Sequence, residues 1–464
     1  DYTVVQAEEG KPNGTFLIEK PADNPNYKAN VEMFAKSFDG NRNKTYATWQ
    51  YFGSPVKSAN RDQLPLESTW VRKYNRTLNV PNSDEKWEDV TTGTLTQGEA
   101  YEITQPKPAN YRFIGELNTG DFTFNVNGMA SATNYQDMNI LANPYTGAMN
   151  IEKLDFSGAT AADKVVYLFN TGSRKDWIAN NGANATINTG VTEGQYTKAI
   201  PANLAGYVNG MPKDIPSLSS FMVKSTGAGT LKYRYADLVN VVATENRAPE
   251  RRFHSLAVDV ESAKSADRLW LVQAEGTTDR YDNGWDGEKI FAPGETALYA
   301  MQDRSYQVTT TETIGETKLG FVPAEGEQNY KLTFHIDGAD GAQEYTLLDK
   351  RTGLTRAIHD GDTYEFTATK GDAAHRFTIL GNGAKATADQ RGFQISADLR
   401  RNFTVKNFTD QPAEALVFDA AGKIQARFTV EPGSENTGTV VMPGAYVVRV
   451  SNKVTTLTQR FVMP

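Results

Sequence analysis

The chain has 464 residues, a formal net charge of −8 and no cysteine. The acidic balance disfavours nucleic acid as a partner, because phosphate binding needs a basic stripe. The lack of cysteine excludes disulfides, thiolate nucleophiles and cysteine metal sites. No run of about 18 apolar residues occurs, so the sequence predicts no membrane-spanning segment.

The composition predicts an all-β fold. The chain contains 21 Tyr and 22 Phe, and aromatic and β-branched residues favour strands. No long stretch has the apolar spacing of an amphipathic helix. With about 150 residues per domain as a guide, we expect two to four domains, arranged as tandem β-sandwich or jelly-roll-like domains.

Residues 1–45 are predicted to form an N-terminal β segment. The chain opens with Asp1–Val5, which has the pattern of a strand, and no leader peptide precedes it. We therefore expect the chain to be part of a longer, exported protein. Strand candidates follow at Gly14–Ile18 and Asn30–Phe34.

Residues 46–243 contain a weak internal repeat. In its first part, apolar residues and a proline coincide at a constant offset of 89 residues, as in Pro55 and Pro144. Three pairs of segments carry the repeat: Tyr46–Val56 with Tyr135–Tyr145, Lys73–Asn75 with Leu168–Asn170, and Leu95–Tyr101 with Ile215–Phe221. Two similar short sheets packed together could bury the apolar side chains that a single short sheet would leave exposed. We therefore expect two tandem similar β units.

Residues 248–381 are predicted to form a β-sandwich. The polar, proline-containing segment Thr244–Arg252 separates them from the repeat. Short apolar stretches separated by Gly, Asp and Asn turns then recur at the spacing of a sandwich. The six strand candidates are Leu269–Val272, Ala297–Ala300, Tyr330–Phe334, Glu344–Leu348, Tyr364–Phe366 and Arg376–Leu380.

Residues 391–464 are predicted to form an Ig-like β-sandwich. Strands are expected around Val417–Ile424, Met442–Val450 and Thr458–Val462, with Ala-Gly or Pro-Gly turns beside the first two. Residues 392–464 carry 8 Lys and Arg and 6 Asp and Glu, a formal charge of +2.

This C-terminal arrangement resembles the β-sandwich domains of exported Bacteroidetes surface proteins, including those that serve as type IX secretion sorting signals. Leu347–Gly353, followed by Tyr364, Phe366 and Arg376-Phe377, is similar to a segment that precedes such domains. The resemblance implies a protein at the cell surface or secreted. It also implies that residues 1–45 are the end of a β-helical or repetitive region.

Segments of the repeat resemble the same proteins. They are Trp49 with Gly53-Ser54-Pro55, Gly98–Tyr101, Phe113–Gly120 and Asn143-Pro144-Tyr145, in that order. Two features depart from the sorting pattern: no Pro-Asn-Pro entry precedes the C-terminal domain, and the chain ends in Met463-Pro464. An Ig-like domain without a sorting role therefore remains the alternative.

Catalytic motifs are missing from the sequence. The four histidines, His254, His335, His359 and His375, form no zinc-binding helix pattern, and we expect structural roles for them. No Gly-x-Ser-x-Gly elbow or phosphate-binding loop occurs. A glycosidase needs only two carboxylates, so a glycoside hydrolase stays as the third hypothesis, and we predict that the chain is not an enzyme.

The densest acidic cluster, Asp279–Glu288, is a candidate cation site. Asp279, Asp282 and Asp286 could offer oxygen ligands to a structural Ca²⁺. Neither EF-hand register fits, because position 3 would be Tyr281 or Gly284. The alternative is a turn-rich loop whose side chains bond to local backbone.

Tryptophans are the candidate sugar-contacting residues. Trp285, in the acidic loop, has the best chance of exposure, and Trp87 and Trp177 lie in polar stretches. Trp49 and Trp270 are expected in the core.

The leading functional prediction is a non-catalytic surface or secreted protein that mediates adhesion or attachment. Its partner would be a host or matrix protein or a surface glycan. The alternative is a glycan-binding accessory module of a surface carbohydrate-utilisation system.

Overall fold

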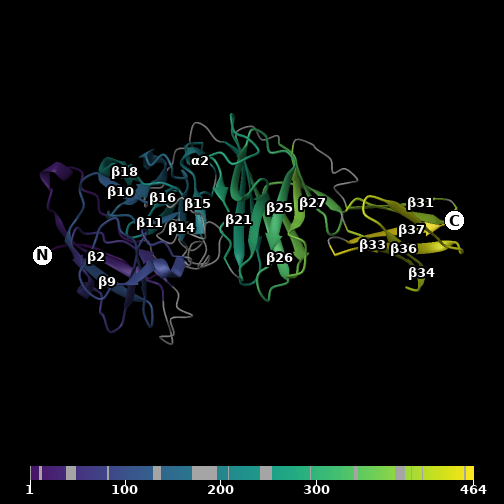
Figure 1. Ribbon diagram of the computed structural model, residues 1–464, viewed down its shortest axis with the longest axis horizontal. Helices are drawn as coiled ribbons and strands as arrows, with labels where there is room; N and C mark the ends of the chain where they lie inside the picture. Colours follow the sequence, from purple (N-terminus) through teal and green to yellow (C-terminus); the bar gives the residue numbers. More distant parts are fainter. Residues whose placement is uncertain are drawn as a thin grey trace. The chain divides into compact units, whose positions relative to one another are not determined.

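A computed structural model shows that the described part of the chain is nearly all β (Figure 1), which confirms the predicted fold class. The structure describes residues 2–9, 13–37, 49–80, 83–128, 137–169, 196–206, 208, 210–240, 253–292, 294–338, 343–381, 392–398, 400–409, 411–453 and 456–463. Helical elements within these ranges are short: α2 (Pro201–Ala205), η1 (Pro21–Asp23), η3 (Arg61–Gln63), η4 (Ser83–Lys86), η5 (Ile151–Lys153) and η6 (Tyr235–Asp237). None of them is long or apolar enough to cross a membrane.

The chain divides into two compact units. The first comprises Asp1–Phe253 together with Tyr281–Ala292, and the second comprises His254–Arg280 and Pro293–Pro464. The acidic loop predicted as a cation site is therefore split between them, because Asp279 belongs to the second unit and Asp282 and Asp286 to the first.

The first unit contains two copies of one strand arrangement. Two four-stranded sheets have orders β3-β8-β5-β6 and β11-β17-β14-β15, so that each strand of the first has a counterpart in the second. The first sheet consists of β3 (Gln50–Phe52), β8 (Tyr101–Thr104), β5 (Trp70–Tyr74) and β6 (Trp87–Asp89). The second consists of β11 (Met138–Ala142), β17 (Ser220–Lys224), β14 (Val166–Phe169) and β15 (Tyr196–Ala199). The segment pairs matched by sequence contribute to equivalent strands of the two sheets.

Smaller sheets repeat the same correspondence. The ladder of β2 with β9 parallels that of β10 with β18, and the pair β4–β7 parallels β12–β16. The remaining strands extend these sheets. The bounds are β1 (Thr3–Val5), β2 (Lys28–Ala35), β9 (Ala109–Glu116), β10 (Phe122–Val126), β18 (Gly229–Tyr233), β13 (Asp155–Gly158), β4 (Ala59–Asn60), β7 (Thr94–Leu95), β12 (Ala148–Asn150), β16 (Asp214–Ile215) and β19 (Leu238–Val239).

Local capping chemistry is shared by the two copies as well. Asn60 ends β4 and caps η3, its side chain accepting a hydrogen bond from the amide of Asp62. Asn150 ends β12 and caps η5 in the same way, with the amide of Glu152 as donor. An asparagine side chain satisfies a free amide at the start of a helical turn, so both copies turn at the same point.

Within residues 1–45, the described strand β2 is not separate from the repeat. Strand β2 pairs along its whole length with β9, from Lys28 opposite Glu116 to Ala35 opposite Ala109. Its inward side chains, including Val31 and Met33, join the buried core of the first copy. The structure thus differs from the expected boundary after residue 45, because long-range strand pairing is not visible in local sequence.

The second unit begins with one long sheet. Its strand order is β28-β27-β30-β25-β23-β24-β21-β20-β26-β29. Strands β28 and β29 lie at the two ends of this order, yet only the turn of residues 359–362 joins them. The sheet must therefore curl until its edges approach each other. The bounds are β20 (His254–Glu261), β21 (Ala266–Gln273), β23 (Ala297–Met301), β24 (Ser305–Thr311), β25 (Thr317–Val322), β26 (Asn329–Asp337), β27 (Tyr345–Asp349), β28 (Leu354–Ile358), β29 (Thr363–Thr367) and β30 (His375–Leu380).

The C-terminal module has the two-sheet arrangement of an Ig-like sandwich. One sheet has the order β31-β32-β35 and the other β34-β33-β36-β37. Buried residues from both sheets, among them Phe403, Val417 and Val448, form its own core. The bounds are β31 (Phe393–Ala397), β32 (Asn402–Asn407), β33 (Ala413–Asp419), β34 (Ile424–Val430), β35 (Glu435–Thr439), β36 (Gly444–Ser451) and β37 (Thr456–Met463).

Candidate functional site

The acidic loop is held by its own turn. The carboxylate of Asp286 is buried and accepts a hydrogen bond from the amide of Asp282 at 2.8 Å. The amides of Trp285 and Asp286 donate to the carbonyl of Asp282 at 3.0 and 3.1 Å. These are the local bonds expected of a turn-rich acidic loop.

The predicted Ca²⁺ ligands differ in their surroundings. Asp279 is exposed, whereas the carboxylate of Asp286 is buried and bound to backbone. Nowhere in the described ranges do three or more His, Asp or Glu side chains come close enough together to hold a metal ion. Calcium needs six to eight oxygen ligands, so the geometry gives this prediction no support and it stays untested.

Trp285 packs inside the first unit. Its ring lies 5.7 Å from that of Phe253, and its carbonyl accepts a hydrogen bond from Asn203 at 3.1 Å. Asn283, beside it, accepts from the amide of Lys164 at 2.9 Å. Trp285 is half-buried.

Trp87 belongs to an aromatic cluster formed by both copies of the repeat. Its ring centroid lies 5.0 Å from those of Tyr51 and Tyr74. Tyr51 in turn stacks on Phe169 at 4.2 Å, and its hydroxyl contacts that of Tyr196 at 3.2 Å. Tyr51 therefore joins the copies, and Trp87 packs against it within the first copy. Trp177, the third tryptophan candidate, lies outside the described residues.

A second aromatic group flanks this cluster on the sheet of β3, β8, β5 and β6. The guanidinium of Arg72 lies 4.3 Å from the ring centre of Trp49 and 5.1 Å from that of Trp70. Arg72 also forms an ion pair with the buried Glu102. The faces of both rings are thus directed at a cation of the same chain. Trp49 is half-buried, while Trp270 is fully buried as expected for a core residue.

Asp163 is a titratable residue that sequence reasoning missed. Burial raises the pKa of its carboxyl group, as hydrolases require of a general acid. Nearby, Lys224 and Glu288 form an ion pair at 3.3 Å. A glycosidase needs a second carboxylate available to a sugar or a water, and Glu288 is engaged by the lysine.

Asp259 resembles part of a catalytic constellation but is fully engaged. It accepts two hydrogen bonds from Arg268 and one from Nε2 of His335 at 3.1 Å. Burial alone would raise the pKa of Asp259, but these hydrogen bonds outweigh it and hold the pKa at about 2. The carboxylate therefore acts as an anchor for two neighbouring strands.

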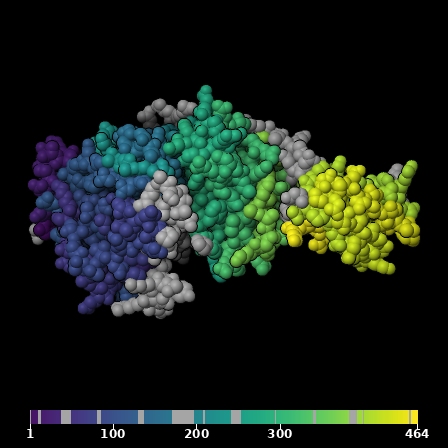
Figure 2. All heavy atoms as spheres, in the orientation of Figure 1, coloured from purple at the N-terminus to yellow at the C-terminus, as the bar shows by residue number. Residues whose placement is uncertain are grey.

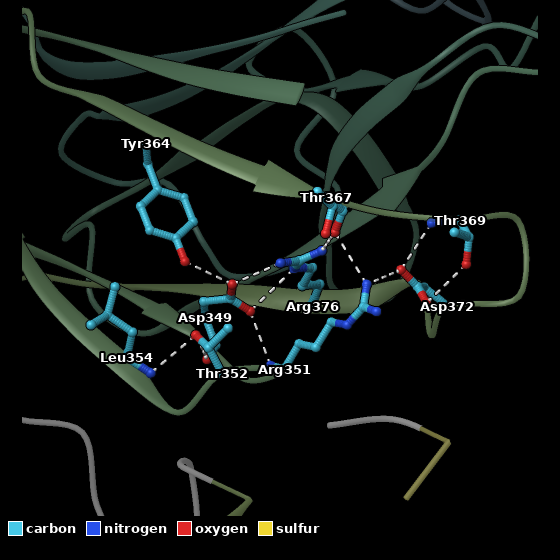
Figure 3. A network of polar contacts seen from close by, with 9 residues as sticks. All are labelled: Asp349, Arg351, Thr352, Leu354, Tyr364, Thr367, Thr369, Asp372 and Arg376. Carbon is cyan, nitrogen blue, oxygen red and sulfur yellow. Dashed lines mark hydrogen bonds and ion pairs between the residues drawn. The ribbon is translucent and has the colours of Figure 1, made fainter. Parts of the chain in front are cut away.

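A polar network closes the curled sheet of the second unit (Figure 3). The carboxylate of Asp349 is fully buried and accepts from Nε and Nη2 of Arg376 at 3.1 and 2.9 Å. It also accepts from the hydroxyl of Tyr364 at 2.9 Å and from the amide of Arg351 at 3.0 Å. Burial and the nearby Asp349 raise the pKa of Tyr364 to about 12, so the phenol keeps its proton.

Arginine side chains donate hydrogen bonds to carbonyl groups on the free edge of β29. The carbonyl of Thr367 accepts from both Arg351 and Arg376, and that of Thr363 accepts from Arg356 at 2.9 Å. Unpaired edge carbonyls would otherwise remain open to another strand. The segment around Asp349, noticed in the sequence for its resemblance, thus supplies the bonds that close the sheet.

These geometries favour structural over catalytic roles. A general base needs a free lone pair directed at substrate, whereas Asp259 and Asp349 are surrounded by donors from the protein itself. The sequence alone could not show that donors from the protein surround these two carboxylates, because the partners of each carboxylate depend on strand register.

Comparisons with known proteins identify a family and a relative of this chain. A family model described as "Domain of unknown function (DUF8693)" matches residues 11–380. The chain is 31% identical over 484 aligned residues to the minor fimbrium subunit Mfa5 of Porphyromonas gingivalis, a member of the Bacteroidetes. The match covers 99% of this chain but only 38% of the length of that protein.

Among solved structures, the chain matches one described as "Biofilm associated protein - BSP domain". The identity is 8%, and the match covers 94% of this chain and 95% of the other, with a TM-score of 0.15.

Proposed function

This chain belongs to the DUF8693 family of domains, and we propose that it is a non-catalytic, exported component of a bacterial surface appendage that mediates attachment. The similarity to a minor fimbrium subunit across almost the entire chain carries this proposal. The chain corresponds to 38% of that subunit's length.

Buried polar groups whose hydrogen bonds are all made within the protein support a rigid structural role for the chain in preference to a catalytic one. Asp349 and Arg376 bond to each other through two hydrogen bonds in the closed sheet. Networks of this kind rigidify a fold when every group is satisfied. An attachment protein needs such rigidity, whereas a hydrolase needs at least two carboxylates free to act on substrate.

Gene deletion in the bacterium that carries the chain tests the proposal. We expect the protein in the fraction of appendages sheared from wild-type cells, and weaker attachment of the deletion strain to host cells or matrix proteins. Complementation should restore both. An unchanged attachment together with glycan hydrolysis by the purified protein would reject the proposal.

The partner class is tested with the purified chain on glycan arrays and immobilised matrix proteins. Trp285→Ala and Trp87→Ala are the informative variants, because both rings are half-buried. Saturable glycan binding that Trp285→Ala abolishes would favour the accessory-module alternative. Binding to a matrix protein that neither variant weakens would support adhesion through another face.

Residues 391–464 are proposed to direct type IX secretion, on the strength of the sequence resemblance alone. Fusing this segment to a periplasmic reporter tests the role. Transfer of the reporter to the cell surface in a type IX-competent strain, but not in a secretion mutant, is the expected result. Retention in the periplasm of both strains would leave the module as an Ig-like domain without a sorting role.

A further inference from the structure

The outward face of one sheet in the C-terminal module is unusually apolar. In β33, Ala415 and Val417 point into the core, while Leu416 and Phe418 alternate with them and point outward, only partly buried. Register places Phe418 beside Ile424 on one side and Val447 on the other. A sheet face that meets only water is normally polar, so this face is suited to a partner.

Arginines are interspersed with these apolar side chains. Arg460 lies opposite Val447, and Arg449 lies opposite both Leu416 and Thr458. The two arginines are thus diagonal neighbours, about 7–8 Å apart at Cα. Both are exposed, and neither forms an ion pair within the part of the chain that the structure describes. A third, Arg427, is balanced by Glu414 at 3.4 Å.

The most exposed apolar side chains of the described chain lie at one end of the same sheet. Val462 is 84% exposed, Val441 82% and Met442 67%. Val462 pairs with Ala445, and the carbonyl of Met442 accepts from the hydroxyl of Tyr446 at 2.6 Å, so these residues are neighbours. Their large exposed fractions show that these side chains project into solvent from the C-terminal module, which is yellow in Figure 2.

We propose that this face, formed by β34, β33, β36 and β37, docks on an anionic lipid surface. Charge complementarity selects the partner: two unpaired arginines on one face match a layer of phosphate groups. Projecting valine and methionine side chains can enter the acyl boundary just below that layer. Residues 392–464 carry a formal charge of +2 in a chain of −8, so the module is basic although the chain as a whole is acidic.

Lipid docking goes beyond the proposed attachment role and does not depend on it. A peripheral contact of this kind would hold the module at a bilayer surface without a spanning helix. Insertion of apolar side chains and contact of arginines with phosphate groups are both needed for stable binding, because one weak membrane contact alone gives only reversible binding.

Co-sedimentation of the full chain with sucrose-loaded vesicles tests the proposal. The probes are phosphatidylcholine vesicles with and without about a third of phosphatidylglycerol, at low and high salt. We expect binding to the acidic vesicles only, weakened by salt. Arg449→Gln/Arg460→Gln should lower the affinity roughly thirtyfold, the loss expected for two surface arginines. Val462→Ser/Met442→Ser should lower it about tenfold at either salt concentration.

The matched control is Lys232→Gln/Lys406→Gln, which removes the same charge from exposed positions on other strands. Thermal unfolding would verify that every variant folds. Three results would each overturn the proposal: no binding to acidic vesicles, equal losses in the arginine and lysine variants, or self-association of the chain that the arginine variant abolishes. The last would assign the face to a second copy.

Discussion

Gly98 and Leu218 occupy equivalent positions in the two copies of the repeat, and both have left-handed backbone, with φ of 75° and 65°. The carbonyl of each accepts a hydrogen bond from the other copy at 3.1 Å, from Ala142 and Gly53 respectively. Gly53 and Ala142 are themselves equivalent, 89 residues apart. The copies therefore meet through reciprocal contacts, like the subunits of a two-fold dimer.

Gly98→Ala is expected to destabilise the first unit by about 2–4 kcal/mol. A Cβ atom at Gly98 would lie 2.4 Å from the ring of Phe122, and its φ is unfavourable for any side chain. Gly93→Ala is the matched control, because its φ is 94° but nothing lies within 4 Å; it should cost only about 1 kcal/mol. Urea unfolding measures both, and equal losses would contradict the predicted clash.

Arg61→Met should cost about 3 kcal/mol, because it leaves buried acceptors unpaired. The guanidinium is buried and donates to the carbonyls of Leu64, Thr69 and Val90. At the equivalent place in η5 stands the buried Ile151, so only the first copy depends on these bonds.

Thermal unfolding would measure the effect of Arg61→Met. Arg427→Met is the control, since the side chains of Arg427 and of its partner Glu414 are 60% and 50% exposed; we expect a loss below about 1 kcal/mol. A similar loss in the two variants would show that the buried acceptors find other donors.

Asp349→Asn and Arg376→Met should each destabilise the second unit by about 3–5 kcal/mol, because each leaves the other buried and unpaired. The double variant should lose less than the sum. Glu414→Gln, in an exposed ion pair with Arg427, should cost less than about 1 kcal/mol. Unfolding of all four variants forms the test, and additive losses would argue against a coupled pair.

Acidification should destabilise the chain through His375. Burial, followed by the charges of Lys350 and Lys318, lowers the pKa of His375 to about 4. The unfolded chain binds this proton near the ordinary histidine pKa of about 6.5. The free energy of unfolding therefore contains the full contribution of the neutral ring above that pH. This contribution is lost as the pH falls from about 6.5 to 4.

His375→Gln tests this dependence. Unfolding at pH 7 and pH 4.5 should show a smaller difference for the variant than for the wild type, by about 1–2 kcal/mol once solvent screening is allowed for. His359→Gln is the control, because its side chain is 79% exposed. Identical pH profiles for wild type and His375→Gln would show that the ring titrates normally.

The segment around Asp349 shows what lay within reach of sequence and what did not. Its resemblance to a recurring surface-protein segment was visible, and so were the strands on either side. The sequence did not show that Asp349, Tyr364 and Arg376 form one network. Their contacts depend on the register of β27 with β30 and on the curl of the sheet. The same applies to Leu416 and Phe418, whose outward direction depends on which face of β33 meets the core.

Sequence alone determined the all-β class and the internal similarity, because strand periodicity, turn residues and repeated phrases are local properties of the chain. It also raised the acidic loop and its tryptophan as candidates. Only the tertiary structure decided that β2 belongs with the first copy, that the carboxylate of Asp286 is bound to its own turn, and that Asp259 and Asp349 are saturated by donors. Each of these depends on contacts between residues far apart in the chain, and such contacts are set by strand pairing and packing.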